Sequence, residues 1–288
     1  MQRKLHPLEG IVAAFALVFV LALTIGFAQA GDAKPLKAVA LRSSSVMVQD
    51  AGTGEIFFNK NADVVVPIAS ITKLMTAMVI LDRALELDQR VVLSREDVDA
   101  RKGSRSRLRT GAVLTRDELL LLSLMASENR AAAALGRTYP GGMDAFVAVM
   151  NEKAGALGMT DSRFVDSTGL SARNVSSARD LVKLVNAAQR YPLIREYSTR
   201  PSAHVRARGG RVGYNNTNSL VRSGRWDIDL SKTGYIAAAG RCLVMHMRVA
   251  SRDLVVVLLD SYGKYSRIGD AQRLRKWLET SAAREPRS

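Results

Sequence analysis

The most constraining feature of the sequence is the stretch from Pro67 to Leu81, PIASITKLMTAMVIL. Apolar residues occupy nearly every side of a helix drawn through it, and a helix of this kind is buried. Ser70 and Lys73 are polar groups in its first turn, and residues three apart share a helix face. A buried lysine is costly unless its charge is paired or its pKa falls. Because a lysine with a lowered pKa can take a proton from a serine, the stretch predicts a serine nucleophile with a lysine base.

The S-x-x-K pattern has a plainer interpretation, because so short a motif arises by chance about once in a chain of this length. A second copy, Ser261 to Lys264, follows an apolar strand-like run and contains Gly263. It predicts a loop with a solvated lysine. Only the copy at Ser70 opens a buried helix, so other motifs must decide between catalysis and coincidence.

The first thirty residues predict a secretory signal peptide. Arg3 and Lys4 are followed by an apolar run over residues 11–27 and by the small-x-small site Ala28–Ala30. An uncleaved membrane anchor is the alternative, but the run is short for a membrane span. We expect residues 31–288 to be a soluble protein outside the cytoplasm.

The charge of the chain is strongly basic, with a formal net charge of +15. The densest cluster, Arg101–Arg109, predicts either a solvated loop or a patch for an anionic polymer such as the cell wall. Nucleic acid is not expected as a partner, because an exported chain rarely meets it and the cluster has neither interleaved aromatic residues nor a nucleic-acid motif. The lone Cys242 cannot form an internal disulfide and lies in an apolar run, which predicts a buried thiol.

The order of predicted elements favours an α+β fold. β-rich runs at 46–48 and 55–58 around a Gly-rich turn predict a hairpin. A helical middle and a return to strands after about residue 190 predict an antiparallel sheet lobe (36–69 and 190–288) with an inserted helical lobe (70–189). The predicted helices are 70–85 or 70–87, 115–127, 129–137, 143–157, 177–188 and 267–280, and the later strands are 228–235, 242–250 and 254–259.

Two more short motifs stand out from apolar surroundings. Ser127-Glu128-Asn129 falls at the break between two predicted helices, where Ser127 could instead be a helix cap. Lys232-Thr233-Gly234 falls within a strand-like run, where the lysine could instead be exposed on an edge strand and the glycine could mark a bulge. Gly234 would also permit close approach by a ligand. The three motifs in this order are much harder to obtain by chance than any one of them.

These motifs together resemble the set found in serine β-lactamases and penicillin-binding proteins. The chain is most similar to the low-molecular-mass penicillin-binding proteins, the D-alanyl-D-alanine peptidases, and the resemblance extends to segments 166–170, 177–181 and 216–218. Segments 127–133 and 139–142 resemble the short periplasmic branch, the D-alanyl-D-alanine endopeptidases. One departure is Glu128, where the motif set has aspartate, but this residue is not a reacting group.

The resemblance implies specific roles near the nucleophile. Ser70 would attack the carbonyl of a D-alanine residue, and Lys73 would accept its proton. Ser127 would relay a proton to the leaving nitrogen. Asn129 would hold the substrate amide and keep Lys73 in place.

It also implies roles for the strand motif. Lys232 and Thr233 would bind the substrate carboxylate, with Gly234 beside them. The backbone N–H groups of Ser70 and Tyr235 would form the oxyanion hole. No cofactor or metal is expected, because the sequence has no zinc motif, phosphate-binding loop or dinucleotide fingerprint.

The function that the resemblance implies is hydrolysis of D-alanyl–diaminopimelate cross-links in peptidoglycan through an acyl-enzyme, in cell-wall turnover and cell shape. β-Lactams would be covalent inhibitors, and other cell-wall enzymes are candidate partners. The chain ends soon after its last predicted helix, whereas carboxypeptidases of the family often add a β-domain and an anchor, which favours an endopeptidase.

Three alternatives remain. The first is a D-alanyl-D-alanine carboxypeptidase. The second is a β-lactamase, which is disfavoured because no glutamate context suited to water activation appears between Ser127 and Lys232. The third is an inactive cell-wall-binding protein, which the complete motif set argues against.

Overall fold

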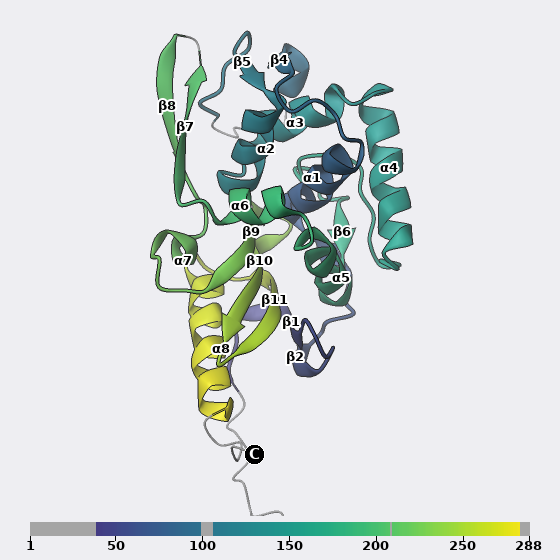
Figure 1. Ribbon diagram of the computed structural model, residues 1–288. Coiled ribbons are helices and arrows are strands. Elements are labelled where there is room, and N and C mark those ends of the chain that lie inside the picture. Colours follow the sequence, from purple (N-terminus) through teal and green to yellow (C-terminus); the bar gives the residue numbers. More distant parts are fainter. Residues whose placement is uncertain (1–38, 99–105, 208, 283–288) are drawn as a thin grey trace, which may run out of the picture. The chain divides into compact units, whose positions relative to one another are not determined.

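The computed structural model describes residues 39–98, 106–207 and 209–282 (Figure 1). The predicted signal peptide, residues 1–30, and residues 101–105 of the arginine cluster lie outside the described residues. Within the described residues, no helix is both long and apolar enough to cross a membrane.

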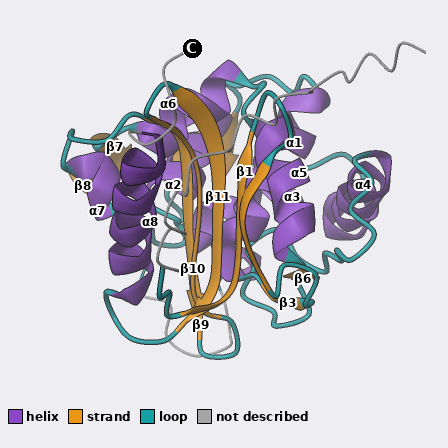
Figure 2. Cartoon of the chain, turned by 90° about the horizontal axis from the view of Figure 1, so that it is seen from below, coloured by secondary structure: helices purple, strands orange, loops and turns teal. Residues whose placement is uncertain are grey.

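Strands from the two ends of the chain form the main sheet (Figure 2). Its order is β2-β1-β11-β10-β9, and every pairing is antiparallel. The bounds are β1 Ser43–Asp50, β2 Ile56–Lys60, β9 Ile228–Ile236, β10 Gly240–Val249 and β11 Arg252–Ser261. Three small two-stranded sheets pair β3 Val66–Pro67 with β6 Val175–Ser176, β4 Arg90–Val92 with β5 Val113–Thr115, and β7 Ser202–Ala207 with β8 Gly210–Asn215.

Most of the helices lie in the middle of the chain, and a further helix follows the last strand. The α-helices are α1 Thr72–Asp82, α2 Arg116–Met125, α3 Asn129–Arg137, α4 Gly142–Ala156, α5 Ala178–Ala188, α6 Pro192–Thr199, α7 Ser219–Arg222 and α8 Ser266–Ala282. Two 3₁₀ turns, η1 Ala69–Ile71 and η2 Arg95–Asp97, complete the described elements. The predicted α+β architecture with an antiparallel sheet flanked by helices is confirmed. The described residues group into one compact unit, and the two lobe boundaries stay a prediction.

Helices cover both faces of the main sheet, which explains why its strands are apolar without alternation. In β11, Leu254, Val256 and Leu258 pack with α8 residues, whereas Val255 and Val257 belong to the core that contains α5. Figure 2 shows α8 and α5 on opposite sides of the strands. Because each face is buried, alternate side chains on both faces must be hydrophobic.

Two expectations about local structure were wrong. The helix after Ser70 ends at Asp82 rather than near residue 85 or 87, because Ala84 adopts a left-handed conformation with φ of 50°. The segment after Tyr191 begins with a helix, α6, because Pro192 occupies its first turn, where a missing N–H costs nothing. The β7–β8 hairpin follows it and was not predicted as an element.

A glycine controls how closely the 166–171 loop approaches the start of α1. Gly169 has a φ of 78°, and a Cβ placed on it would lie 1.9 Å from the Ala69 carbonyl oxygen. Both the backbone conformation and the missing side chain are therefore required there.

We expect Gly169→Ala to destabilise the fold by about 2–4 kcal/mol, because it combines a strained left-handed conformation with overpacking. Urea unfolding measures the change. Gly155→Ala in α4 is the matched control, since a Cβ added there would meet no atom of another element within 4 Å, and alanine should stabilise that position by about 0.5–1 kcal/mol. Equal midpoints for the two variants would contradict the close approach.

Candidate active site

Ser70 lies in a 3₁₀ turn that leads directly into α1. The preceding Ala69 has a φ of 48°, and its carbonyl oxygen accepts a hydrogen bond from Thr72 Oγ1 at 2.8 Å. Strand β9 runs against this turn at Gly234, where an added Cβ would lie 2.9 Å from the Ile68 oxygen and 3.1 Å from Ser70 N. Gly234 is in regular register with Cys242, so the bulge interpretation is wrong. The close approach there is by the chain's own backbone.

Lys73 is fully buried and lies among oxygen atoms. Its Nζ is 2.9 Å from Ser70 Oγ, 2.8 Å from Asn129 Oδ1 and 2.5 Å from the Thr168 carbonyl oxygen. Burial lowers the pKa of Lys73 to about 7, although the negative charges of Asp166 and Glu128 act in the opposite direction. The amine therefore exists in both protonation states near neutral pH.

The loop that supplies the Thr168 carbonyl is held by one carboxylate. Asp166 accepts hydrogen bonds from the backbone N–H groups of Thr168 (2.7 Å), Gly169 (2.7 Å) and Ser171 (3.0 Å) and from Asn174 Nδ2 (2.8 Å). Burial alone would raise the pKa of Asp166, but hydrogen bonds from the Thr168 hydroxyl and from the backbone N–H groups of Gly169, Thr168 and Ser171 hold it below its ordinary value. Sequence reasoning noted this segment as part of the resemblance but gave it no role, because a carbonyl ligand has no side-chain signature.

Ser127 lies at the junction of α2 and α3 with a left-handed backbone, φ 57°. Glu128, not Ser127, caps α3 by accepting a hydrogen bond from the N–H of Arg130, so the capping interpretation of Ser127 is wrong. The Ser127 hydroxyl instead accepts a hydrogen bond from Lys232 Nζ at 2.8 Å. The unusual backbone turns the serine toward β9.

Lys232 is buried although β9 is an edge strand, so the interpretation as an exposed edge lysine is wrong. Burial lowers the pKa of Lys232 well below its ordinary value, and the neighbouring charges of Lys73 and Arg267 lower it further. The next residue, Thr233, donates its hydroxyl to Thr217 Oγ1 at 2.6 Å. Thr217 in turn donates its backbone N–H to the Met125 carbonyl at the end of α2.

Arg267 of α8 is a residue that sequence reasoning missed. Its Nη1 donates to the Gly234 carbonyl at 2.7 Å and to the Cys242 carbonyl at 3.1 Å. Burial and the nearby Arg241 lower the pKa of Arg267 to about 10. Tyr235, which follows Gly234, exposes its side chain, and the Arg241 guanidinium lies 4.4 Å from the centre of its ring.

The structure thus brings the predicted residues together from three segments of the chain, 70–73, 127–129 and 232–235. Lys73 joins Ser70 to Asn129, Lys232 joins β9 to Ser127, and Gly234 abuts Ser70. The described residues contain no group of three or more His, Cys, Asp or Glu placed to hold a metal ion.

The other sequence features lie outside this cluster. Lys264 of the second S-x-x-K copy is exposed in a loop, as predicted. Cys242 is buried, as predicted, and burial raises the pKa of its thiol to about 11. In the described part of the arginine cluster, Arg107 donates to the Gly213 carbonyl and covers the ring of Tyr214.

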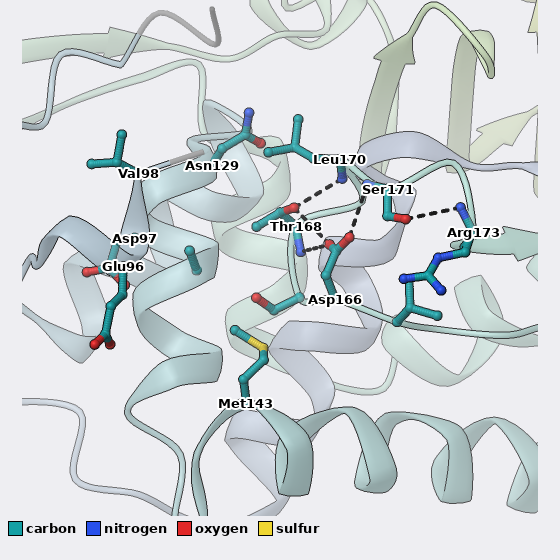
Figure 3. A pocket seen from close by; sticks show the side chains of 13 residues that line it. Glu96, Asp97, Val98, Asn129, Met143, Asp166, Thr168, Leu170, Ser171 and Arg173 are labelled. Atoms are coloured by element: carbon teal, nitrogen blue, oxygen red, sulfur yellow. Dashed lines mark hydrogen bonds between the residues drawn. The ribbon is translucent and has the colours of Figure 1, made fainter. Parts of the chain in front are cut away.

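A pocket of about 340 Å³ adjoins Asn129 and Thr168 (Figure 3). It lies between η2, α3, the start of α4 and the 166–173 loop. Its lining residues are Glu96, Asp97, Val98, Asn129, Ala133, Met143, Val165, Asp166, Ser167, Thr168, Leu170, Ser171 and Arg173.

Comparisons with known proteins agree with this arrangement. Residues 31–263 match the family described as D-alanyl-D-alanine carboxypeptidase. A D-alanyl-D-alanine endopeptidase of Pseudomonas aeruginosa is 49% identical over 83% of this chain and 78% of its own, and one of Escherichia coli is 44% identical over 93% and 88%.

Solved structures give the same result. A Streptomyces DD-transpeptidase superposes with a TM-score of 0.77 at 26% identity, covering 83% of this chain and 97% of its own. A D-alanyl-D-alanine carboxypeptidase of Mycobacterium tuberculosis also has a TM-score of 0.77, at 28% identity, covering 86% and 94%. The chain therefore belongs to the D-alanyl-D-alanine carboxypeptidase family of serine peptidases.

Proposed function

We propose that this protein is a periplasmic serine DD-endopeptidase that hydrolyses D-alanyl–diaminopimelate cross-links in peptidoglycan. The observation that carries the proposal is the position of the buried Lys73 amine, within hydrogen-bond distance of Ser70 Oγ. Relatives at 44–49% identity are named endopeptidases, which supports this activity over the carboxypeptidase alternative. Residues 1–30 would serve as the signal peptide that exports the chain.

The contacts of Lys73 assign its protons. A neutral amine has two N–H bonds and one lone pair. Asn129 Oδ1 and the Thr168 carbonyl can only accept, so they take the two N–H bonds. The lone pair then points at Ser70 Oγ and can accept its proton as the serine attacks the D-alanine carbonyl.

The oxyanion that forms would be held by the N–H groups of Ser70 and Tyr235. The Gly234 carbonyl points toward Arg267 and the β10 side of β9. Across a trans peptide bond the N–H of the next residue points the opposite way, so the Tyr235 N–H faces the Ser70 turn. Ser70 N lies close to this peptide, as the Gly234 geometry requires. Two preorganised donors of this kind stabilise a tetrahedral intermediate.

The leaving group would depart on the side of Lys232. The Ser127 hydroxyl accepts from Lys232, so its own proton is available to the amine of the departing diaminopimelate. Lys232 and Thr233 would bind the carboxylate beside that amine. Water then hydrolyses the acyl-enzyme. β-Lactams would acylate Ser70 in the same way.

We expect Ser70→Ala to abolish covalent labelling by a fluorescent penicillin, because the Ser70 hydroxyl is the one that lies beside the Lys73 amine and can lose its proton to it. The measurement is fluorescence of the protein band on a denaturing gel. Circular dichroism of the variant controls for folding. Labelling of a folded Ser70→Ala variant would exclude Ser70 as the nucleophile.

The acylation rate should depend on pH through Lys73. Only the neutral amine accepts a proton, and its pKa is about 7. The second-order rate constant for benzylpenicillin should therefore fall about tenfold per pH unit below 7 and reach a plateau above it. A stopped-flow profile between pH 5 and 9 tests this expectation. A rate that is constant across pH 7, or that rises on acidification, would rule out Lys73 as the base.

Digestion of purified peptidoglycan distinguishes the endopeptidase from the carboxypeptidase. We expect cross-linked dimers to disappear and uncross-linked tetrapeptides to appear on chromatography of the muropeptides, with Ser70→Ala as the inactive control. If the enzyme leaves dimers intact and releases terminal D-alanine from pentapeptides, the carboxypeptidase assignment replaces ours.

A further inference from the structure

We propose that the pocket beside Asn129 binds the donor stem, which is the peptide of the cross-link that carries the attacked D-alanine. Arg173 would recognise a carboxylate of this stem and Glu96 an ammonium. This inference rests on the proposed function and deepens it, because it assigns the part of the substrate that precedes the attacked D-alanine.

The direction of the substrate follows from the two lysines. Lys232 and Ser127 lie on the side where the leaving group and its carboxylate would bind. Asn129 and the Thr168 carbonyl instead contact Lys73, which joins them to Ser70. The acyl part of the substrate must therefore extend past Asn129. Asn129 and Thr168 both line the pocket, so the donor stem meets it next.

The pocket has apolar walls and charged side chains of both signs. Val98, Met143 and Leu170 are half-buried and offer contact to aliphatic chain. The two aspartates in the lining are already engaged: Asp97 pairs with Arg137 at 2.8 Å, and Asp166 binds its own loop.

Among the described lining residues, Glu96 and Arg173 are the charged side chains left for a ligand. Both are exposed, and Figure 3 shows them on opposite sides of the pocket. Glu96 approaches Arg137 only at 4.0 Å. Opposite charges at two ends of one pocket suit a ligand that carries both signs at separate points.

The donor stem has this chemistry. In a polymer built from one repeated stem, the diaminopimelate that forms cross-links also precedes the attacked D-alanine. When no further cross-link uses it, the end of its side chain carries a free ammonium, with a carboxylate on the same carbon. The residue before it is a glutamate linked through its side chain, which leaves its α-carboxylate free. A short aliphatic segment with an ammonium and a carboxylate nearby matches the apolar walls, Glu96 and Arg173.

Four synthetic cross-linked dimers test the inference. They carry the donor glutamate carboxylate either free or amidated, and the donor side-chain amine either free or acetylated. We expect the wild type to cleave each free form about three- to fivefold faster in kcat/KM than its blocked form, the size expected of one exposed charge pair. Arg173→Gln should lose only the carboxylate preference, and Glu96→Gln only the amine preference.

The controls separate this inference from the proposed function. Arg163→Gln and Glu152→Gln change exposed charges outside the pocket and should keep both preferences. Benzylpenicillin lacks the stem, so all variants should be acylated at the wild-type rate. If Arg173→Gln and Glu96→Gln keep both preferences, or the wild type has none, the pocket assignment is wrong while the endopeptidase activity stands. If the wild type is acylated by penicillin but cleaves no dimer, the proposed function itself fails.

Discussion

Burial of the Lys73 amine is the constraint on which the rest of the site depends. A fall in pKa from 10.5 to about 7 corresponds to roughly 5 kcal/mol in favour of the neutral form. Because the amine is buried away from solvent, each of its N–H bonds needs a protein acceptor. The structure provides them with Asn129 at the start of α3 and the Thr168 carbonyl of the 166–171 loop. Both segments are far from Lys73 in sequence, so the tertiary fold must hold each one in place.

The loop beneath Lys73 shows how a carbonyl is held in place. Asp166 gathers the backbone N–H groups of its own loop, and Ser167 donates its hydroxyl to the Ala132 carbonyl of α3 at 2.8 Å. Thr76 of α1 donates to the Ser167 carbonyl at 2.7 Å. The loop is therefore fastened both to α1 and to α3, and its motion would change the surroundings of Lys73.

Close approach of backbone segments matters as much as polar contact. Gly169 lets the loop touch Ala69, and Gly234 lets β9 touch Ser70, so two segments meet the serine turn from different directions. β9 is an edge strand, and edges normally carry exposed charges. Here its lysine turns inward to Ser127, and Arg267 of α8 fixes the Gly234 carbonyl from the opposite side. The edge strand thus becomes one wall of the site.

The sequence by itself determined the strand pattern of the two chain ends, the buried helix after Ser70 and the identity of the polar groups in the three motifs. These are local signals: apolar runs, turn residues and polar side chains that stand out in apolar surroundings. It could not reveal that Thr168 contributes a carbonyl, that Arg267 reaches β9, or that Pro192 opens a helix packed between β9 and α2. Hydrogen bonds to backbone carbonyls and contacts between distant segments leave no residue pattern, because every residue type has a backbone carbonyl. Only the tertiary structure decided which groups surround Lys73 and Lys232, and desolvation of both amines follows from that arrangement.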